Sequence, residues 1–288
     1  MIKKISLITL SIGVVLFLAI YTTAKNDSAL KIHFLDVGQG DAILIRTPEH
    51  QDILIDGGPG NLVVDEIGKY LLFYDRDIEI MILTHAHSDH VSGLVEVLKR
   101  YEVDQVLFSG NVDHDAPDYL AWLGIIEQKS IPLIVATCCK TYQLGNQVEL
   151  QILYPFEDYS GKELEDLNES SLVSRLVYKD RKFLFTGDAP LEVEEKIIEK
   201  DLPIESDVLK VGHHGSKYSS GELFLDAVNP DYAVIQSGEG NSFGHPHFKT
   251  VNNLQKRNVE MMRTDQCGTI IMETNGNDLK LSSERCDL

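Results

Sequence analysis

Short apolar runs alternate with amphipathic stretches along most of this chain, and this alternation restricts the fold more than any other feature of the sequence. The runs KIHFLDV, AILIRT and DILID predict three strands separated by glycine-containing turns. The next stretches predict, in order, a helix in NLVVDEIGKYLLFY, a buried strand in IEIMILT, a helix in VSGLVEVLKRY, a strand in VDQVLFS, a helix in PDYLAWLGIIEQK and a strand in IPLIVA.

The second half of the chain repeats this pattern. Strands are expected in NQVELQILYP, SSLVSRLVYKD, RKFLFTGD, SDVLKVG, PDYAVIQS and finally GTIIMET, and helices in PLEVEEKIIEKD, SSGELFLDAV and HFKTVNNLQKR. Two strand-rich halves, each accompanied by helices, predict an α/β fold with helices outside two packed sheets, a four-layered αββα sandwich. With 288 residues, 43% of them hydrophobic, the chain can form one globular domain, which we place at residues 30–288.

The first 24 residues differ from the rest of the chain. Lys3 and Lys4 precede an uncharged apolar segment at residues 5–20, and small residues follow at Thr22, Thr23 and Ala24. This pattern predicts a signal peptide or an N-terminal membrane anchor at residues 1–24. We therefore expect an exported protein, either extracellular or anchored to the membrane with the domain outside.

Export would permit disulfide bonds among the four cysteines. The adjacent Cys138 and Cys139 are poorly placed to bond to each other, and the sequence has no CxxC spacing typical of a zinc knuckle. A disulfide between Cys267 and Cys286 is compatible with the sequence, which does not establish it.

The chain is strongly acidic. Its 26 basic and 45 acidic residues give a formal net charge of −19. Such a charge opposes broad electrostatic binding to nucleic acid or to an anionic membrane surface. A local cleft rich in metal or basic groups remains compatible with it.

The segment THAHSDH concentrates metal-binding side chains at the end of a predicted strand. His85, His87, Asp89 and His90 lie between the strand IEIMILT and the helix VSGLVEVLKRY, where binding sites gather in α/β folds. Imidazoles and carboxylates suit zinc, manganese or iron. His85 and His87 are two apart and can share one metal in an extended segment, while Asp89 and His90, past a turn, can face a second metal.

Two further strand ends carry polar groups. Asp188 follows the strand in FLFTGD, and His213 and His214 follow the strand in VLKVGHHGS. A lone glycine–aspartate pair is an ordinary turn, but beside the histidine cluster Asp188 becomes a candidate ligand. A carboxylate can bridge two cations through its two oxygens, as two-metal hydrolysis requires.

Taken together, THAHSDH, TGD and HHGS resemble the metallo-β-lactamase superfamily. Within it, LDVGQGDAILI, DGG, NESSLV, HHGSKYSS and GHPH look like the nuclease-like domain of ComEC-type DNA-uptake proteins. The resemblance runs from about residue 32 to residue 271. It implies an αββα sandwich, two divalent metal ions, zinc or manganese, and hydrolysis by a metal-bound hydroxide.

The resemblance also implies a set of ligands. His85 and His87 would hold one metal, Asp89, His90 and His213 the other, and Asp188 would bridge them. The resemblance makes His214 a neighbour that contacts the substrate, or alternatively the ligand in place of His213. His214 or His245 would donate a proton to the leaving group, and we place Asp89 with them in the catalytic set. The remaining matched residues have supporting positions: orientation of ligand imidazoles or a structural role for Asp36, Asp41 and Asp56, and the rim of the cleft or a structural turn for His245 and His247.

The sequence departs from the superfamily pattern at one position. Many superfamily members have a further histidine between HxHxDH and the bridging aspartate, where this chain reads DLNESSLV. Asn168 or Ser170 would stand there, with His114 as a more remote substitute. We therefore expect a weak first metal site, or one filled by manganese rather than zinc.

Three functions remain open at this stage. The first is hydrolysis of phosphodiester bonds, with nucleic acid as the leading substrate. The acidic charge makes a second credible, hydrolysis of a small phosphoester or a lactone. The third is a non-enzymatic metal-binding module of a surface or DNA-uptake complex, held at the membrane through the N-terminal segment if that is not cleaved.

Overall fold

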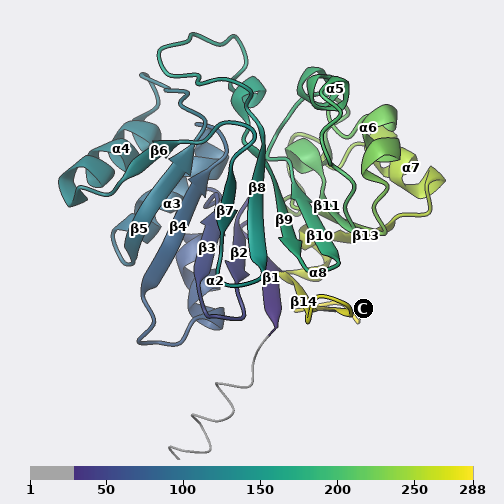
Figure 1. Ribbon diagram of the computed structural model, residues 1–288, viewed down its shortest axis with the longest axis horizontal. Helices are drawn as coiled ribbons and strands as arrows, with labels where there is room; N and C mark the ends of the chain where they lie inside the picture. Colours follow the sequence, from purple (N-terminus) through teal and green to yellow (C-terminus); the bar gives the residue numbers. More distant parts are fainter. Residues whose placement is uncertain (1–28, 288) are drawn as a thin grey trace, which may run out of the picture.

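The computed structural model describes residues 29–287, and the leader predicted at residues 1–24 lies outside them. Two β-sheets pack face to face with helices on both outer sides, which confirms the predicted four-layered αββα sandwich (Figure 1). Within residues 29–287 there is no helix with the length and apolarity needed to cross a membrane.

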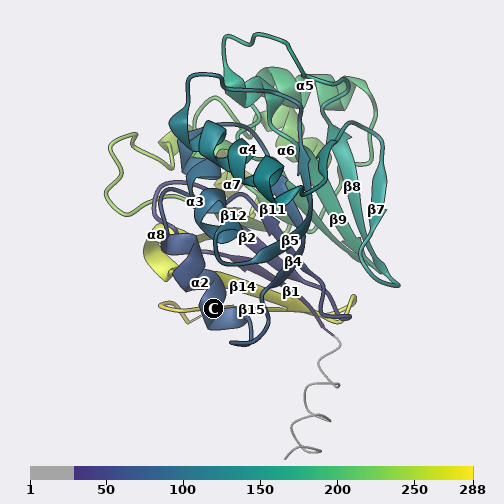
Figure 2. The same cartoon turned by 90° about the vertical axis from the view of Figure 1, so that its left-hand side faces the viewer.

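The first sheet has eight strands in the order β15-β14-β1-β2-β3-β4-β5-β6. Their bounds are β1 (Leu30–Phe34), β2 (Ile43–Arg46), β3 (Asp52–Ile55), β4 (Asp77–Leu83), β5 (Glu102–Phe108), β6 (Leu133–Val135), β14 (Ile270–Thr274) and β15 (Leu279–Ser283). β3 to β6 run parallel, so each connection crosses over through a helix, and these helices are α2 (Leu62–Tyr70), α3 (Ser88–Leu98) and α4 (Pro117–Lys129). Figure 2 shows α2, α3 and α4 on the outer face of this sheet.

The second sheet has seven strands in the order β13-β12-β11-β10-β9-β8-β7. Their bounds are β7 (Thr141–Gln143), β8 (Val148–Tyr154), β9 (Val173–Tyr178), β10 (Arg181–Phe185), β11 (Val208–Lys210), β12 (Tyr232–Ile235) and β13 (Glu260–Arg263). β10 to β13 are parallel. The remaining helices are α5 (Leu191–Glu199), α6 (Glu222–Val228), α7 (Phe248–Lys256), the short α8 (Thr264–Cys267), and the 3₁₀ turns η1 (Leu167–Ser170) and η2 (Gly212–Gly215).

Strand periodicity decides which side chains fill each layer. On β1, Ile32 and Phe34 belong to the core between the sheets, whereas His33, between them, faces α2 with its ring 4.2 Å from that of Tyr70. β4 is buried on both faces, which explains why IEIMILT reads as an almost continuous apolar run. Separate apolar cores join α2–α4 to the first sheet and α5–α7 to the second.

The structure differs from the sequence predictions at several short elements. GTIIMET forms β14 as expected, but it is not the last strand, because β15 follows it and pairs with it antiparallel. β15 was missed because its side chains are only partly buried and Leu279 and Leu281 are its only large apolar residues. The short strands β7 and β13 were also missed, since neither has a run of buried apolar residues.

The prediction for the adjacent cysteines was wrong. The structure pairs Cys138 with Cys139, which are joined by a cis peptide bond and have Cα atoms 3.2 Å apart. The second disulfide, between Cys267 and Cys286, joins α8 to the segment after β15, as the sequence allowed.

Candidate metal centre

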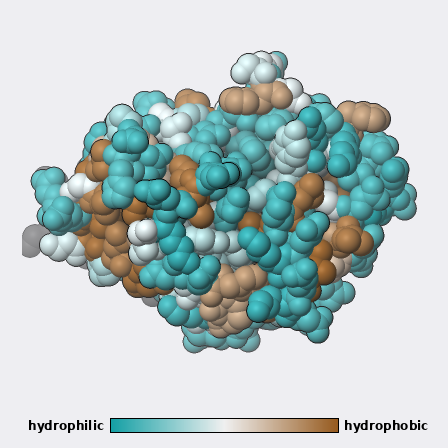
Figure 3. Space-filling view, turned by 90° about the horizontal axis from the view of Figure 1, so that it is seen from above, coloured by the Kyte–Doolittle hydropathy of each residue, from teal (hydrophilic) through white to brown (hydrophobic). Residues whose placement is uncertain are grey.

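The candidate ligands come together where the parallel strands of both sheets end, at the edge of the molecule that is uppermost in Figure 1. From the first sheet, β4 leads into His85, and α3 carries Asp89 and His90 in its first turn. From the second sheet, β10 leads into Asp188, and β11 leads into η2 with His214. Figure 3 shows this end of the molecule as mostly hydrophilic, with hydrophobic side chains in small separate groups.

Close backbone packing brings α3 to the edge of the sheet. A Cβ atom at Gly93 would lie 1.8 Å from the carbonyl oxygen of Gly57, so only glycine fits at this contact. The backbone N–H of Gly57 in turn donates to the carbonyl of His90 at 2.8 Å. The turn after β3 therefore fixes the first turn of α3, and with it Asp89 and His90.

A buried carboxylate orients His90. Asp56 Oδ2 lies 2.8 Å from Nδ1 of His90, and the same carboxylate accepts hydrogen bonds from the backbone N–H and the hydroxyl of Thr84 at 2.8 and 2.7 Å. Because an ionised carboxylate only accepts hydrogen bonds, Nδ1 of His90 carries the proton. Its Nε2 is then left facing Asp188, whose Oδ2 is 3.4 Å away.

His214 is held in a similar way from the second sheet. Its Nδ1 lies 3.0 Å from the carbonyl oxygen of Gln236 and 3.2 Å from Oδ1 of Asp41. Its Nε2 lies 3.3 Å from Oδ2 of Asp89 and 3.4 Å from Oδ2 of Asp188. As with His90, the acceptors at Nδ1 leave Nε2 directed at the carboxylates of the cluster.

Asp188 lies at the middle of the cluster. Its backbone N–H donates to the hydroxyl of Ser171 at 3.2 Å, and its Oδ2 is equidistant from the Nε2 atoms of His90 and His214. On the other side of Asp188, Oδ1 lies 3.9 Å from the ammonium of Lys210. The two oxygens of Asp188 thus face different groups.

His85 and His87 form the outer part of the cluster. Nε2 of His85 lies 3.0 Å from Nδ1 of His87, and Nδ1 of His85 lies 3.1 Å from the hydroxyl of Thr84. His85 is buried, whereas His87 is partly exposed at the start of α3. Nitrogen atoms of the two rings that lie this close can face a single cation.

Lys210 is a buried cation that the sequence reasoning missed. It ends β11, and its ammonium donates to the carbonyl of Gly187 at 3.1 Å and forms an ion pair with Asp41. A lysine inside the apolar run VLKV, directly before the two histidines, was the available signal. A buried ammonium is costly unless it is paired, so Lys210 offsets part of the negative charge of Asp41 and Asp188.

The carboxylates of the cluster favour positive charge in its centre, as a cation site requires. Burial alone would raise the pKa of Asp188, but the positive rings of His214 and His90 hold it well below its usual value. Burial would lower the pKa of His214, yet the carboxylates of Asp188 and Asp41 raise it to about 10. The pocket of carboxylates therefore stabilises positive charge strongly, and protons carry that charge when cations do not.

A second, independent observation also indicates that these residues fit a dimetal centre. His90 Nε2, His214 Nε2 and Asp188 Oδ1 are buried without a hydrogen-bond partner among the described residues. Such atoms are rare in folded proteins because each one costs free energy. Potential ligand atoms within 4.8 Å of one another form four groups: His85–His90–Asp188, Asp89–His90–His214, Asp41–Asp56–His90 and Asp41–Asp188–His214.

Other predicted residues lie around this centre rather than in it. His213 is 28% exposed, and its Nε2 is 3.8 Å from Oδ2 of Asp188. The ring of His245 lies 5.6 Å from that of His213. His247 instead caps α7 by accepting the backbone N–H of Lys249, which fits the structural alternative considered for it.

The segment that replaces the further histidine forms η1. Asn168 and Ser170 are buried there, next to Ser171, and Oδ1 of Asn168 has no hydrogen-bond partner among residues 29–287. The hydroxyl of Ser170 donates to the carbonyl of Leu167 at 2.7 Å. His114 is exposed, lines a separate pocket and belongs to none of the four ligand groups found in the described part of the chain.

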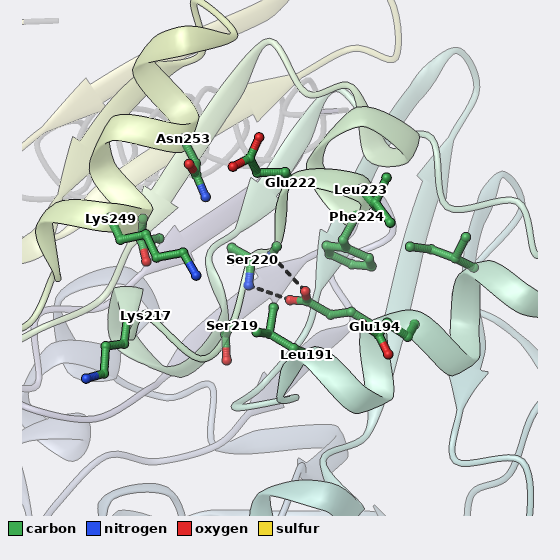
Figure 4. Close-up of a pocket in the computed structure, with 14 residues that line it drawn as sticks. Leu191, Glu194, Lys217, Ser219, Ser220, Glu222, Leu223, Phe224, Lys249 and Asn253 are labelled. Atoms are coloured by element: carbon green, nitrogen blue, oxygen red, sulfur yellow. Dashed lines mark hydrogen bonds between the residues drawn. The ribbon is translucent and has the colours of Figure 1, made fainter.

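A buried glutamate anchors the loop that follows His214. Glu194 on α5 accepts hydrogen bonds from the backbone N–H groups of Ser220 and Gly221 at 2.5 and 2.8 Å (Figure 4). The hydroxyl of Ser220 accepts one from the N–H of Gly212 at 3.2 Å. Glu194 borders a cavity of about 240 Å³ between α5, α6 and α7. Two hydrogen-bonded steps thus connect Glu194 to η2, the turn that carries His214.

Comparison with known proteins agrees with this geometry. Residues 35–239 match the family model of the metallo-beta-lactamase superfamily. The chain is 28% identical over 275 residues to ComE operon protein 3 of Bacillus subtilis, covering 89% of this chain and 34% of that protein. It is 29% identical over 248 residues to competence protein ComA of Neisseria gonorrhoeae, covering 85% and 32%. The chain thus spans about a third of the length of these relatives.

A solved structure shows the same fold. Igni18, a metallo hydrolase from the archaeon Ignicoccus hospitalis, superposes with a TM-score of 0.55 at 15% sequence identity. The match covers 86% of this chain and 100% of that one. At this identity the likeness concerns the fold alone.

Proposed function

The chain belongs to the metallo-β-lactamase superfamily, and on that premise we propose that it hydrolyses phosphodiester bonds, with nucleic acid as the first candidate substrate. The observation that carries the proposal is that Asp188 belongs to two groups of possible ligands, one with His85 and His90 and one with Asp41 and His214. His85 and His87 would hold one divalent cation, Asp89, His90 and His214 the other, with Asp188 between them. This set replaces His213 by His214 as a ligand. Zinc or manganese bound there would lower the pKa of a coordinated water and offset charge on the phosphoryl oxygens.

The supporting side chains keep this set in place. Asp56 fixes His90, and Asp41 with the carbonyl of Gln236 fixes His214, so both imidazoles present Nε2 to the centre. Lys210 faces Oδ1 of Asp188 and leaves Oδ2 toward the two rings. These contacts preorganise the site before substrate arrives, which is the form of electrostatic stabilisation that accelerates hydrolysis most.

Contact with the leaving group falls to side chains at the rim. His214, with both ring nitrogens engaged, is unsuited to that task if it is a ligand. His245 lies beside His213, and burial with the nearby charge of His214 lowers its pKa to about 4, so its ring is neutral at neutral pH. Within the proposal, His213 and His245 therefore orient the leaving oxygen by hydrogen bonds from neutral imidazoles.

The resemblance to ComEC-type DNA-uptake proteins is the reason for proposing a phosphodiester substrate. Competence protein ComA is a competence protein by name, and this chain aligns with about a third of it and of ComE operon protein 3. We carry that likeness to this chain as part of the proposal. The predicted export would place the domain where extracellular nucleic acid is found.

The net charge of −19 favours one alternative, hydrolysis of a small phosphoester or a lactone, because such a substrate needs no long contact with an anionic surface. The third candidate function is an accessory module that binds metal without catalysis.

Assays with single-stranded DNA, duplex DNA, a phosphocholine ester and a lactone, each with manganese, with zinc and with chelator, distinguish the three candidate functions. We expect metal-dependent cleavage of DNA. Cleavage of only the small esters supports the alternative, and no turnover with metal bound supports the accessory module.

A further inference from the structure

An exposed phenylalanine stands at the rim of the metal centre. Phe243, in the loop between β12 and α7, is 69% exposed, and its ring stacks on that of His245 with centroids 5.9 Å apart and planes inclined by 24°. The ring of His245 lies 6.3 Å from that of His214. Phe243 is therefore the solvent-side end of a row of rings whose inner end is a candidate metal ligand.

The loop that carries Phe243 is held by its own hydrogen bonds. The side-chain amide of Asn241 donates to the carbonyls of Gly238 and His245 at 2.9 and 2.6 Å, and its oxygen accepts the backbone N–H of His245 at 3.0 Å. Asn241 thus closes a turn around residues 242–244. These hydrogen bonds fix the backbone of the turn at Phe243.

The same loop is joined to the turn that carries the histidines. The backbone N–H of His247 donates to the carbonyl of Gly215 at 2.8 Å, and a Cβ atom at Gly215 would lie 2.6 Å from Cβ of Pro246. Gly215 directly follows His214 in η2. The loop that carries Phe243 is therefore anchored at its C-terminal end beside His214.

Apart from its stacking on His245, the ring of Phe243 contributes little to the packing of the fold. Phe243 leaves most of its surface in water, which forfeits about 1.5–3 kcal/mol of burial that a core position would supply. The surrounding sequence GEGNSFGHPH is otherwise polar or small. A fixed ring face next to a hydrolytic site is, however, a surface on which a planar group of a substrate can stack.

We propose that Phe243, backed by His245, is a stacking platform for a nucleobase that flanks the phosphodiester held at the metal centre. The inference rests on the proposed phosphodiesterase function and specifies its substrate class: nucleotide esters, with single strands preferred to duplexes. Bases of a single strand have free faces, and stacking on an aromatic side chain contributes about 1–3 kcal/mol per base. A strongly acidic protein gains affinity for nucleic acid in this way without a broad basic surface.

Two substrates with the same leaving group test the platform. Thymidine 5′-(p-nitrophenyl phosphate) and methyl p-nitrophenyl phosphate both release p-nitrophenol, but only the first has a base. For Phe243→Ala we expect KM for the thymidine ester to rise about tenfold, within the range for one stacked base, with the methyl ester unaffected. Phe243→Trp should retain the wild-type KM. The matched control is Phe73→Ala, because Phe73 is 89% exposed in the loop before β4, at the opposite end of the strand from His85.

Equal effects of Phe243→Ala on both esters, or no effect on either, would overturn the platform while leaving the phosphodiesterase function standing. A binding measurement separates the two proposals if the wild type hydrolyses neither ester. Anisotropy of a fluorescent tetrathymidylate, with manganese present so that the metal centre can hold the phosphodiester, should show about tenfold weaker binding to Phe243→Ala than to the wild type or to Phe73→Ala. Weaker binding without turnover supports the platform and rejects the function, and equal binding by all three proteins rejects the platform.

Discussion

His213 and His214 are adjacent in the chain but have different surroundings. His214 is buried with Nε2 within 3.4 Å of two carboxylate oxygens, whereas His213 is 28% exposed with Nε2 3.8 Å from the nearer oxygen of Asp188. Both have left-handed backbone conformations, with φ of 48° at His213 and 53° at His214. This tight turn, which sequence reasoning could not foresee, decides which of the two rings enters the centre.

Metal content should separate the two histidines. We expect the wild type to bind two divalent cations per chain, His214→Ala to lose one of them, and His213→Ala to keep both, because only the ring of His214 belongs to a ligand group. Replacing His85 and His87 together by alanine should remove the other cation. Elemental analysis of the purified variants measures this. Loss of a cation from His213→Ala, with two retained in His214→Ala, would reverse the assignment.

Asp188→Asn should abolish hydrolysis and leave the fold intact. The amide nitrogen cannot bind a cation, so the two sites lose the ligand they share, and losing one preorganised electrostatic element costs about 10²-fold or more in rate. Turnover of bis-p-nitrophenyl phosphate and circular dichroism should be compared with those of Asp180→Asn, a matched change at an exposed turn between β9 and β10. Retention of more than about a tenth of the wild-type rate, well above that expected loss, would exclude a bridging Asp188.

The sequence predicted most of this site because its ligands stand in short motifs after strands. His85, Asp89, His90 and Asp188 all follow a strand end, and parallel strands bring such ends to one edge. Lys210 was missed although a lysine inside an apolar run marked it, and the carbonyl of Gln236 could not be predicted, since each contributes through packing between segments far apart in the chain.

At the scale of elements, the last strands depend on a covalent link. β15 is the edge strand of the first sheet, its side chains are only partly buried, and the segment after it bonds through Cys286 to Cys267 in α8. Few apolar contacts therefore hold β15 in place, and the disulfide restricts its separation from β14 in the unfolded chain as well as in the fold.

Replacing Cys267 and Cys286 by serine should lower the free energy of unfolding by about 3 kcal/mol, the loop-closure entropy for a separation of 19 residues. Urea unfolding measures the change. Hydrogen exchange should show the largest loss of protection in β15 and β14. Cys138→Ser with Cys139→Ser is the control, because that pair closes no loop. Equal decreases in the free energy of unfolding of both double variants would show that closing the loop between α8 and the segment after β15 does not contribute to stability.

Strong elements were predicted better than weak ones for a physical reason. β4 and α3 have periodic apolar residues that are buried, and both were placed correctly. β7 and β13 have at most one buried side chain each and form because neighbouring strands offer them hydrogen bonds. Pairing of that kind leaves no local pattern in the sequence.

At the scale of the whole molecule, each half of the sandwich buries, away from the metal centre, an ionisable group whose pKa is shifted. In the first half, burial and the nearby charges of Lys31 and Arg46 lower the pKa of His33 to about 4. In the second half, burial raises the pKa of Glu194 to about 7, although two backbone N–H groups partly offset it. The two groups therefore affect stability with opposite dependence on pH.

The sign for each group follows from which state binds the proton. Between pH 4.5 and 7, Glu194 is protonated in the fold and ionised in the unfolded chain, so its contribution falls as pH rises. Between pH 6.5 and 4, His33 is neutral in the fold and protonated in the unfolded chain, so its contribution is lost as pH falls. Each shift corresponds to at most about 3 kcal/mol.

Two variants should therefore change the pH profile of stability in opposite directions. The side chain in Glu194→Gln cannot ionise. The free energy of unfolding of this variant should therefore increase relative to that of the wild type as pH rises from 4.5 to 7. His33→Phe keeps a ring against Tyr70 but cannot be protonated. Its free energy of unfolding should therefore increase relative to that of the wild type as pH falls from 6.5 to 4. Urea midpoints of the metal-free proteins at half-unit intervals of pH measure both differences. Parallel profiles for a variant and the wild type would mean that the replaced group has the same pKa in the folded and unfolded chain, and that its burial does not govern its charge.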